Sequence, residues 1–332
     1  MKYWTYLFLL LGLALVTLLV LREGFDDVMG VLAQAGWPLL WLVPLHVLPQ
    51  FCDTLAWRTL LKPNDPQNCA GVPYLFWVTA VRESVGGLLP MTNLAGDLAG
   101  IHLVRQRLPT GPVVASVIGE IFMTVCNQYV FSAIGVVLFF YVTGTLEQTR
   151  TLALGLVFAL PVPILFGLLL HSGSVFKRIE GFLRNMIGPQ ISALLDGQTL
   201  DAEIRAIFQR SGRFVVAMLW QLAGFTIGSL EIWLALQLLG HPVSFPAAIA
   251  LEAVTLAIRN LIFFIPGSLG IQEAGLILFG QMLGLDSGTA LSLSLVKRMR
   301  EVLYGTPALL SWQWAEARRL RATAARDLQV TL

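Results

Sequence analysis

The apolar positions of the chain form long runs separated by short polar segments. Windows of roughly 20 apolar residues are long enough for a helix that crosses a ~30 Å hydrocarbon core. They lie at about 3–21, 37–61, 71–89, 112–142, 151–170, 214–239, 246–265 and 288–314. Two shorter apolar pieces, about 94–104 and 269–284, each follow a break that contains proline and fit half-helices better than full spans. We therefore predict an all-α, polytopic integral membrane protein.

Composition supports this class. Of 332 residues, 56% are hydrophobic and 13% are charged, and the mean hydropathy is +0.73, whereas soluble domains carry about 25% charged residues. A signal peptide is the competing interpretation of residues 3–21. That apolar run is long, only Lys2 stands before it as a charge, and no small-residue cleavage pattern follows. We therefore expect a retained first helix within a single transmembrane domain, 1–332.

Basic residues are concentrated in a few segments. Residues 172–213 carry six Lys or Arg, and the segment 315–332 carries four Arg. The positive-inside rule places both segments in the cytoplasm, together with Lys2, Lys62 and the Arg105/Arg107 pair. We thus predict a bacterial inner-membrane protein with cytoplasmic N- and C-termini. Apolar residues at helical spacing between Val175 and Ile187 also predict an amphipathic helix on an anionic membrane surface, within a linker of residues 172–213.

This topology has a consequence for the two short apolar pieces. The region 71–110 has to begin and end in the cytoplasm, and the region 246–287 has to begin and end outside. Each region is therefore predicted to be a re-entrant helical hairpin, which enters the membrane, breaks and returns. The two hairpins would enter from opposite faces of the membrane.

The two hairpins share a sequence pattern. Each has an arginine, a proline and an acid in the same order, seven or eight residues apart: Arg82, Pro90 and Asp97 in RESVGGLLPMTNLAGDLAG, and Arg259, Pro266 and Glu273 in RNLIFFIPGSLGIQEAG. A glycine-containing loop and a long helix with polar residues follow each. We predict an inverted repeat with units 71–142 and 246–314. The alternative is that these prolines and glycines have no function, since both are frequent in membrane helices.

Ionisable residues inside predicted spans are functional candidates, because their desolvation is so unfavourable. Lys297 and Arg298 could instead form local ion pairs with Glu301, at spacings of four and three residues. Asp97 and Glu273 have no opposite charge nearby in sequence, and each follows the start of a half-helix. The free N–H groups at such a start can bind an anion or be capped by a side chain.

We expect the broken helices to bring these acids together near the bilayer midplane, in a polar cavity of mixed charge. The predicted substrate-binding residues are Arg82, Asn93, Asp97, Glu120, Arg259, Gln272, Glu273, Lys297 and Arg298. The predicted helix breaks are at Pro90, Pro266, Gly267 and Gly270. Such a cavity suits a zwitterionic or anionic lipid head group. Its carboxylates could bind a cationic group, hold the arginines in place or carry protons, and the sequence leaves these roles open.

A second polar stripe lies on the window 37–61, where His46, Gln50, Asp53 and Trp57 share one helix face. It predicts either interhelical hydrogen bonds or a further wall of the cavity. The three cysteines and four histidines show no metal or redox spacing, so neither a metal nor another cofactor is expected. No Walker motif occurs, so we expect no ATP hydrolysis by this chain. Nothing indicates a nucleic-acid partner.

Three segments carry a family resemblance: GGLLPMTNLAGDLAG, IPGSLGIQEAG and SLSLVKRMREVLYG. They resemble the signature of the lysylphosphatidylglycerol synthase transmembrane, or flippase-like, family, and the N-terminal half is similar in style to hopanoid-biosynthesis-associated membrane proteins. The resemblance implies an inner-membrane protein that moves or handles lipids. The family pattern carries over to Pro266, Gly267, Gly270, Glu273 and Arg298, and in the first half to Pro90, Asp97 and Glu120. The stretch MTNLAGD departs from the more glycine-rich form of many relatives.

Larger members of that family add a soluble aminoacyl-transfer domain. Only 18 residues follow Trp314 here, so we expect no synthase activity and no catalytic residues. The favoured function is translocation or handling of a phospholipid or a hopanoid. An intramembrane lipid transferase is one alternative, but Asp97 has no second Asp at metal-binding spacing. A scaffold that binds lipid-biosynthesis enzymes is the other alternative.

Overall fold

The computed structural model describes residues 30, 33, 35–88, 93–171, 197–261 and 271–330. The predicted first helix at 3–21 and the predicted surface helix at 175–187 lie outside these residues. The same holds for the four predicted helix-break residues, Pro90, Pro266, Gly267 and Gly270.

The described chain consists of helices and connecting turns, without a strand, which confirms the all-α class. In chain order the elements are η1 (Trp37–Trp41), α3 (Leu42–Leu61), η2 (Lys62–Asn64), α4 (Val72–Leu88), α5 (Asn93–Val104), α6 (Thr110–Thr143), α7 (Leu146–Ala159), α8 (Pro161–His171), α11 (Gly197–Gln209), α12 (Ser211–Leu238), α13 (Phe245–Leu261), α14 (Ile271–Met282) and α15 (Ser287–Val330). Within the described residues, four segments are long and apolar enough to cross a membrane: Trp37–Asn64, Thr110–Thr143, Leu146–Leu169 and Ser211–Leu238.

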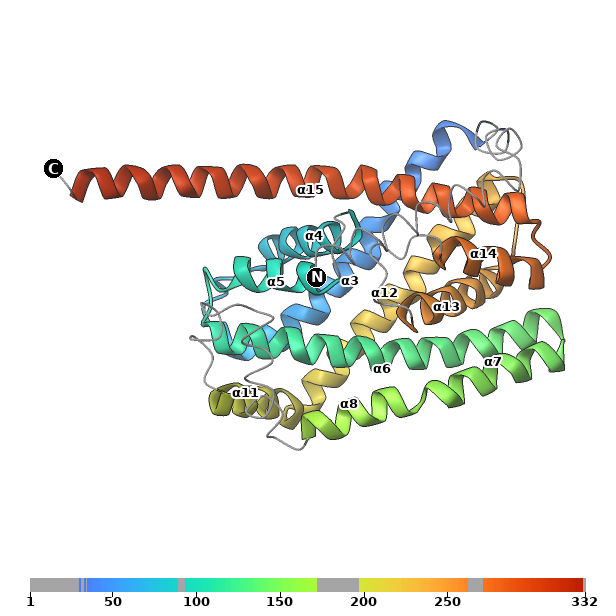
Figure 1. Ribbon diagram of the computed structural model, residues 1–332, viewed down its shortest axis with the longest axis horizontal. Helices are drawn as coiled ribbons and strands as arrows, with labels where there is room; N and C mark the ends of the chain where they lie inside the picture. Colours follow the sequence, from blue (N-terminus) through green and yellow to red (C-terminus); the bar gives the residue numbers. More distant parts are fainter. Residues whose placement is uncertain are drawn as a thin grey trace, which may run out of the picture.

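Most described helices agree with the predicted windows to within a few residues. The exceptions are the window 151–170, which corresponds to α7 and α8 although α7 begins five residues earlier, and the last window. Both short pieces are helical in their described part, as α5 and α14. The final helix α15 does not stop near Trp314 but continues to Val330, and it projects beyond the body of the protein (Figure 1). The segment predicted as a basic tail therefore extends this helix. Asp286 caps the start of α15, because its carboxylate accepts hydrogen bonds from the backbone N and the hydroxyl of Thr289 at 2.8 and 2.7 Å.

The antiparallel helices α3 and α12 form the centre of the fold and pack along their lengths (Figure 1). Gly224 of α12 allows this approach. A Cβ at that position would lie 3.3 Å from Asp53 Oδ1 and from the backbone oxygen of Pro49 on α3. Small residues at such crossings let helix backbones come close in a membrane, where tight packing replaces the hydrophobic effect as the driving force.

Helices α4 and α5 pack side by side, and the start of α4 lies next to the end of α5. These two termini are here called the free ends of the pair. The hydroxyl of Tyr74, in the first turn of α4, donates to the backbone oxygen of Leu103, in the last turn of α5, at 2.8 Å. Gly96 and Gly100 on α5 face Arg82 on α4. A Cβ at Gly96 would lie 2.3 Å from the backbone oxygen of Arg82, and a Cβ at Gly100 would lie 2.4 Å from Arg82 Cδ.

The described basic residues Lys62, Arg107 and Arg213 lie at one end of the molecule, here called the basic end. Arg107 donates to the backbone oxygen of Cys69 at 3.0 Å, so the loop after α5 lies beside the loop after α3. His102 near the end of α5 lies 3.5 Å from Glu316 of α15. The first turn of α12 is also there, since Arg213 and Lys62 line the same small cavity.

The opposite end contains the loops after α12 and α14 and a buried apolar cluster between them. Leu39, Leu239 and Leu285 belong to one buried cluster there, and His241 lies 3.8 Å from Asp286. The start of α13 and the end of α14 therefore lie at this end, whereas the start of α4 and the end of α5 lie at the basic end.

The two predicted repeat units pack on each other reciprocally. Helix α4 contacts α15, where Trp77 donates to the Ser311 hydroxyl at 2.8 Å. Helix α13 contacts α6, where Gln128 donates to the backbone oxygen of Leu256 at 3.1 Å. The first helix of each unit thus packs against the long helix of the other.

Helix α11 is the described part of the predicted surface linker. Its apolar residues Leu200, Ile204 and Ile207 are buried in the protein core. Ile207 lies against Gly119 of α6, where an added Cβ would be 3.4 Å from the isoleucine side chain. In this part of the linker the apolar face packs on α6, and its polar face is exposed.

Helices α7 and α8 present the opposite case, a strongly apolar surface that the protein does not cover. None of the most hydrophobic window in Leu146–Leu169 is buried by the protein, and Phe158 is 89% exposed. An apolar surface of this kind is unfavourable in water and favourable in the hydrocarbon of a bilayer. This face of the fold therefore contacts the membrane interior.

The crossing of α6 and α13 provides a test of the packing. Replacing Gly135 by Ala puts a Cβ 2.4 Å from Ala253 Cβ. We expect Gly135→Ala to lower the free energy of unfolding by about 1–3 kcal/mol, the range for overpacked cores. Unfolding in mixed detergent and SDS micelles measures this change.

Gly155→Ala is the matched control, because it lies within α7 and a Cβ there has no neighbour within 4 Å. It should leave stability unchanged or raise it by up to ~1 kcal/mol through helix propensity. Equal stability of the two variants would contradict the close crossing.

Candidate functional site

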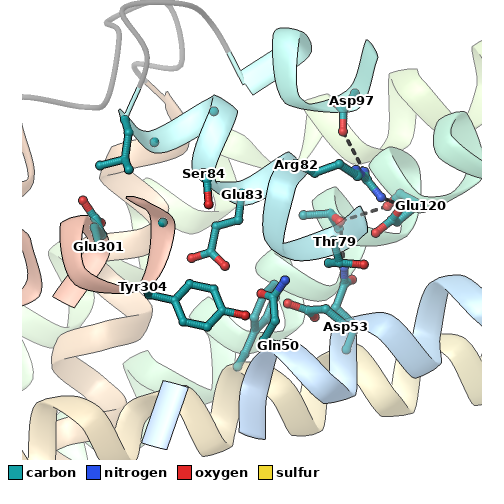
Figure 2. Close-up of a pocket in the computed structure, with 17 residues that line it drawn as sticks. Gln50, Asp53, Thr79, Arg82, Glu83, Ser84, Asp97, Glu120, Glu301 and Tyr304 are labelled. Atoms are coloured by element: carbon teal, nitrogen blue, oxygen red, sulfur yellow. Dashed lines mark hydrogen bonds and ion pairs between the residues drawn. The ribbon is translucent and has the colours of Figure 1, made fainter. Parts of the chain in front are cut away.

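A cavity of about 290 Å³ lies among α3, α4, α5, α6, α12 and α15. Most of the residues that line it are polar or charged, although the surrounding helices are apolar on their outer faces. Figure 2 shows acidic, amide and hydroxyl side chains pointing into it from α3, α4, α5, α6 and α15. A polar hollow among membrane helices is costly to form, and for this reason it marks the candidate site.

Arg82 is the central charge of one wall. One of its terminal nitrogens donates to Asp97 Oδ1 and the other to Glu120 Oε2, both at 2.7 Å (Figure 2). The side chain is only 11% exposed. A planar guanidinium can bridge two carboxylates in this way, whereas a lysine ammonium is a single point charge. Three of the predicted substrate-binding residues are therefore brought together.

Two further features hold Arg82 in place. The guanidinium lies 4.4 Å from the centroid of the Trp57 ring, in a cation–π contact. Trp57 is fully buried, and its indole N–H donates to the Ser116 hydroxyl at 3.0 Å. On the other side, Gly100 of α5 leaves room for the arginine stem. The orientation of Arg82 is thus set by side chains from α3, α5 and α6.

A second network contains His46, Glu83, Glu231 and Arg300. His46 Nδ1 lies 2.8 Å from Glu231 and Nε2 lies 3.0 Å from Glu83. Arg300 is 3.2 Å from Glu231, and its guanidinium is against the His46 ring. Sequence reasoning identified these groups only as ionisable or polar positions in spans. Their partners are distant in sequence, so no local spacing could have revealed the network.

A third network surrounds Glu273, which is fully buried. Its Oε1 accepts hydrogen bonds from Arg298 at 3.3 Å and from Ser294 at 3.1 Å. Arg298 also donates to Glu301 at 3.0 Å, and Glu301 lies 3.9 Å from Arg300. Glu301 therefore connects the second and third networks, and it lines the cavity as well.

Asp97 and Glu273 were expected to meet, but they belong to separate networks. Asp97 lies in the cavity wall with Arg82, whereas Glu273 pairs with Arg298 outside the lining. Lys297 pairs with Glu252 of α13 at 2.7 Å rather than with its neighbour Glu301. Arg298 does form the local pair with Glu301 that its spacing allowed.

The remaining predicted residues are less informative. Gln272 is buried, and its amide has no hydrogen-bond partner among the described residues. The side chains of Asn93 and Arg259 lie outside the description.

The residues of the polar stripe on α3 take both of the predicted roles, interhelical hydrogen bonding and lining of the cavity. Trp57 and His46 make interhelical contacts, while Gln50 and Asp53 line the cavity. Gln50 Nε2, Asp53 Oδ1 and Tyr304 Oη are buried, and none has a hydrogen-bond partner within the described chain. In Figure 2 these three groups gather on one side of the cavity. Sequence reasoning missed Tyr304, because a single tyrosine in an apolar helix carries no distinguishing signal.

Negative charge exceeds positive charge in these networks. Within the described residues, the carboxyl groups of the networks and their cavity are Asp53, Glu83, Asp97, Glu120, Glu231, Glu252, Glu273 and Glu301. The basic groups are His46, Arg82, Lys297, Arg298 and Arg300. Uncompensated charge is unfavourable in a membrane, so this excess among the described residues favours protonated carboxyl groups or a bound cationic group. Among the described residues, no cluster of His, Cys, Asp or Glu has the arrangement of a metal site.

The comparison with known families agrees with this architecture. A family described as lysylphosphatidylglycerol synthase TM region matches residues 7–307. The chain belongs to this family. The match spans the cavity and all helices from α3 to α14, and it ends within α15. Membership in the lysylphosphatidylglycerol synthase TM family, with the apolar spans, identifies a multi-pass membrane protein of a lipid-related family. No curated protein and no solved structure matches the chain.

The Arg82 bridge provides a second test. Arg82→Gln leaves Asp97 and Glu120 as uncompensated buried charges, so the free energy of unfolding should fall by about 3–5 kcal/mol. Adding Asp97→Asn and Glu120→Gln to the same chain should restore part of the loss, because the unpaired charges are gone. Unfolding in mixed micelles would measure both variants.

Arg150→Gln is the control, since Arg150 is exposed on α7. Its effect should stay within about 0.5 kcal/mol. If Arg82→Gln proves equally mild, the bridge is not an important source of stability.

Proposed function

We propose that the protein translocates or otherwise handles membrane lipids, with the lipid head group in the acid-rich cavity beside Arg82. The observation that carries the proposal is this polar cavity among membrane-spanning helices, in a member of a lipid-related family. The head group would use the cavity while the tails stay among the acyl chains. We propose transport rather than synthesis, and a driving force other than ATP hydrolysis by this chain.

The charge of the cavity favours a head group that contains a cation. Arg82 is already bonded to two acids, whereas Asp53 and Gln50 present buried atoms without partners in the described chain. An ammonium group could donate to the Asp53 carboxylate and reduce the negative excess, whereas Gln50 Nε2 is a donor that an oxygen of the same head group could satisfy. A purely anionic head group would add to it. We therefore favour a zwitterionic phospholipid as substrate, with a hopanoid that bears a polar cationic group as the second class.

We further propose that α4–α5 and α13–α14 are re-entrant hairpins of an inverted repeat. Two observations support this. The free ends of the two hairpins lie at opposite ends of the molecule. The reciprocal packing of α4 on α15 and of α13 on α6 is what a pseudo-twofold relation requires.

In this proposal the repeat also includes the helix before each hairpin. Helix α3 precedes α4, helix α12 precedes α13, and α3 packs directly on α12. Two related units that meet at a central helix pair can rock against each other, exposing the cavity to one leaflet and then to the other. Glu301, which lies near both Arg298 and Arg300, could exchange between them during such a motion.

The proposed location is the bacterial inner membrane, with both termini in the cytoplasm. Its basis is the clustering of Lys62, Arg107 and Arg213 at one end, together with the positive-inside rule.

Lipid transfer in reconstituted vesicles tests the proposed function. A fluorescent amine-containing phospholipid should exchange between leaflets faster with the protein than in empty vesicles, measured by chemical quenching of the outer leaflet. Asp53→Asn should slow the exchange about tenfold, equivalent to ~1.4 kcal/mol in the barrier. The reason is that this change removes a cavity carboxylate that does not hold Arg82.

Arg150→Gln should retain the wild-type rate, and both variants should elute as folded protein in detergent. Wild-type rates equal to those of empty vesicles would refute translocation. A normal rate for Asp53→Asn would instead remove Asp53 from the head-group site.

A further inference from the structure

A second polar cavity lies at the basic end, separate from the acidic one. It has a volume of about 300 Å³, similar to the smaller ligand pockets of proteins. Arg58 and Lys62 at the end of α3 line it together with Arg213 in the first turn of α12. Three cations therefore converge on one hollow at the point where the central helix pair reaches the membrane surface.

Among the described residues that line this cavity, the one acid is Asp65, and both of its oxygens already accept hydrogen bonds. Asp65 Oδ1 accepts from the backbone N of Cys69 at 2.7 Å, and Oδ2 accepts from the backbone N of Ala70 at 2.9 Å. Arg58 donates to the neutral amide oxygen of Asn68 at 3.1 Å. Within the described residues, no carboxylate lies within salt-bridge distance of Arg58, Lys62 or Arg213. The cavity thus keeps its positive charge.

The loop that forms the cavity floor is built in advance of any ligand. Besides the two Asp65 hydrogen bonds, Arg107 from the loop after α5 donates to the backbone oxygen of Cys69 and holds this loop from outside the cavity lining. Asn68 has a φ of 55°, which turns the backbone sharply at this point. Helix α12 begins at Ser211, so the partial positive charge of its N-terminus is also nearby.

We propose that this cavity binds a phosphate group, carried by an anionic phospholipid of the leaflet at the basic end. Arginine and lysine donors that converge without a competing acid match the oxygen acceptors of a phosphate. Basic pockets between helix ends at the cytoplasmic surface are a known way to bind lipid head groups. The opposite sign of the central cavity makes the two sites chemically distinct, so this proposal does not depend on the transport function.

A bound phosphate would link the end of α3 to the start of α12. These two helices carry Asp53 and Gln221 of the central cavity. The anionic lipid would therefore act as a structural ligand that fixes the helix pair at one end. It would be retained through purification rather than transferred.

Binding to the purified full-length protein in neutral detergent tests the proposal. The probes are short-chain phosphatidylglycerol, the corresponding diacylglycerol without phosphate, and inorganic phosphate. We expect phosphatidylglycerol to bind and diacylglycerol not to bind. The combined variant Arg58→Gln, Lys62→Gln and Arg213→Gln should weaken phosphatidylglycerol binding at least tenfold.

The control combines Arg150→Gln, Arg205→Gln and Arg321→Gln, which removes the same charge from exposed positions outside the cavity. It should bind like the wild type. Arg213→Gln alone, at an exposed position, should weaken binding several-fold without affecting folding.

Inorganic phosphate distinguishes the source of the group. If it binds and competes with the lipid at millimolar concentration, the site recognises the phosphate itself, and if only the lipid binds, the leaflet is the source. Equal phosphatidylglycerol binding by the cavity variant and the control variant, or no binding of either phosphate compound, would overturn the proposal.

Discussion

The structure depends on a buried arginine that two carboxylates share within a membrane domain. Arg82 carries a charge that hydrocarbon does not tolerate, and Asp97 and Glu120 carry two more. None of the three is stable there alone, so α4, α5 and α6 have to assemble together. The glycines of α5 follow from this requirement, since a larger residue at Gly96 or Gly100 would displace the arginine. The same cluster leaves a polar surface open to the cavity.

Charges of opposite sign are separated along the central helix pair. Midway along α3 and α12, acids exceed bases around the cavity that contains Asp53. At the basic end of the same helices, Arg58, Lys62 and Arg213 converge without an available acid. The two proposals therefore place different chemistry at the two depths, a cationic group within the protein and an anionic group at its surface. One helix pair thus connects a proposed transport cavity to a proposed lipid anchor.

Sequence determined the class of the protein and most of its helices. Apolar windows gave α3, α4, α6, α12 and α13 to within a few residues, because the hydrocarbon thickness fixes the length of a span. The short apolar pieces at 94–104 and 269–284 correspond to α5 and α14. The end of α15 was predicted too early, because a polar helix beyond the membrane has no apolar pattern to mark it. The family followed from local motifs, which need no tertiary information.

Only the tertiary structure decided which charges meet. Sequence grouped Arg82, Asp97 and Glu120 as candidates, but also placed Glu273 and Lys297 in the same cavity. The structure instead pairs Lys297 with Glu252, 45 positions away, and His46 with Glu231, 185 positions away. Spacing along a helix sets which side chains share a face, but not how that face is rotated toward its neighbours. That rotation is fixed by glycine crossings and side-chain packing between distant segments, and it decides which acids line the cavity and which are neutralised behind it.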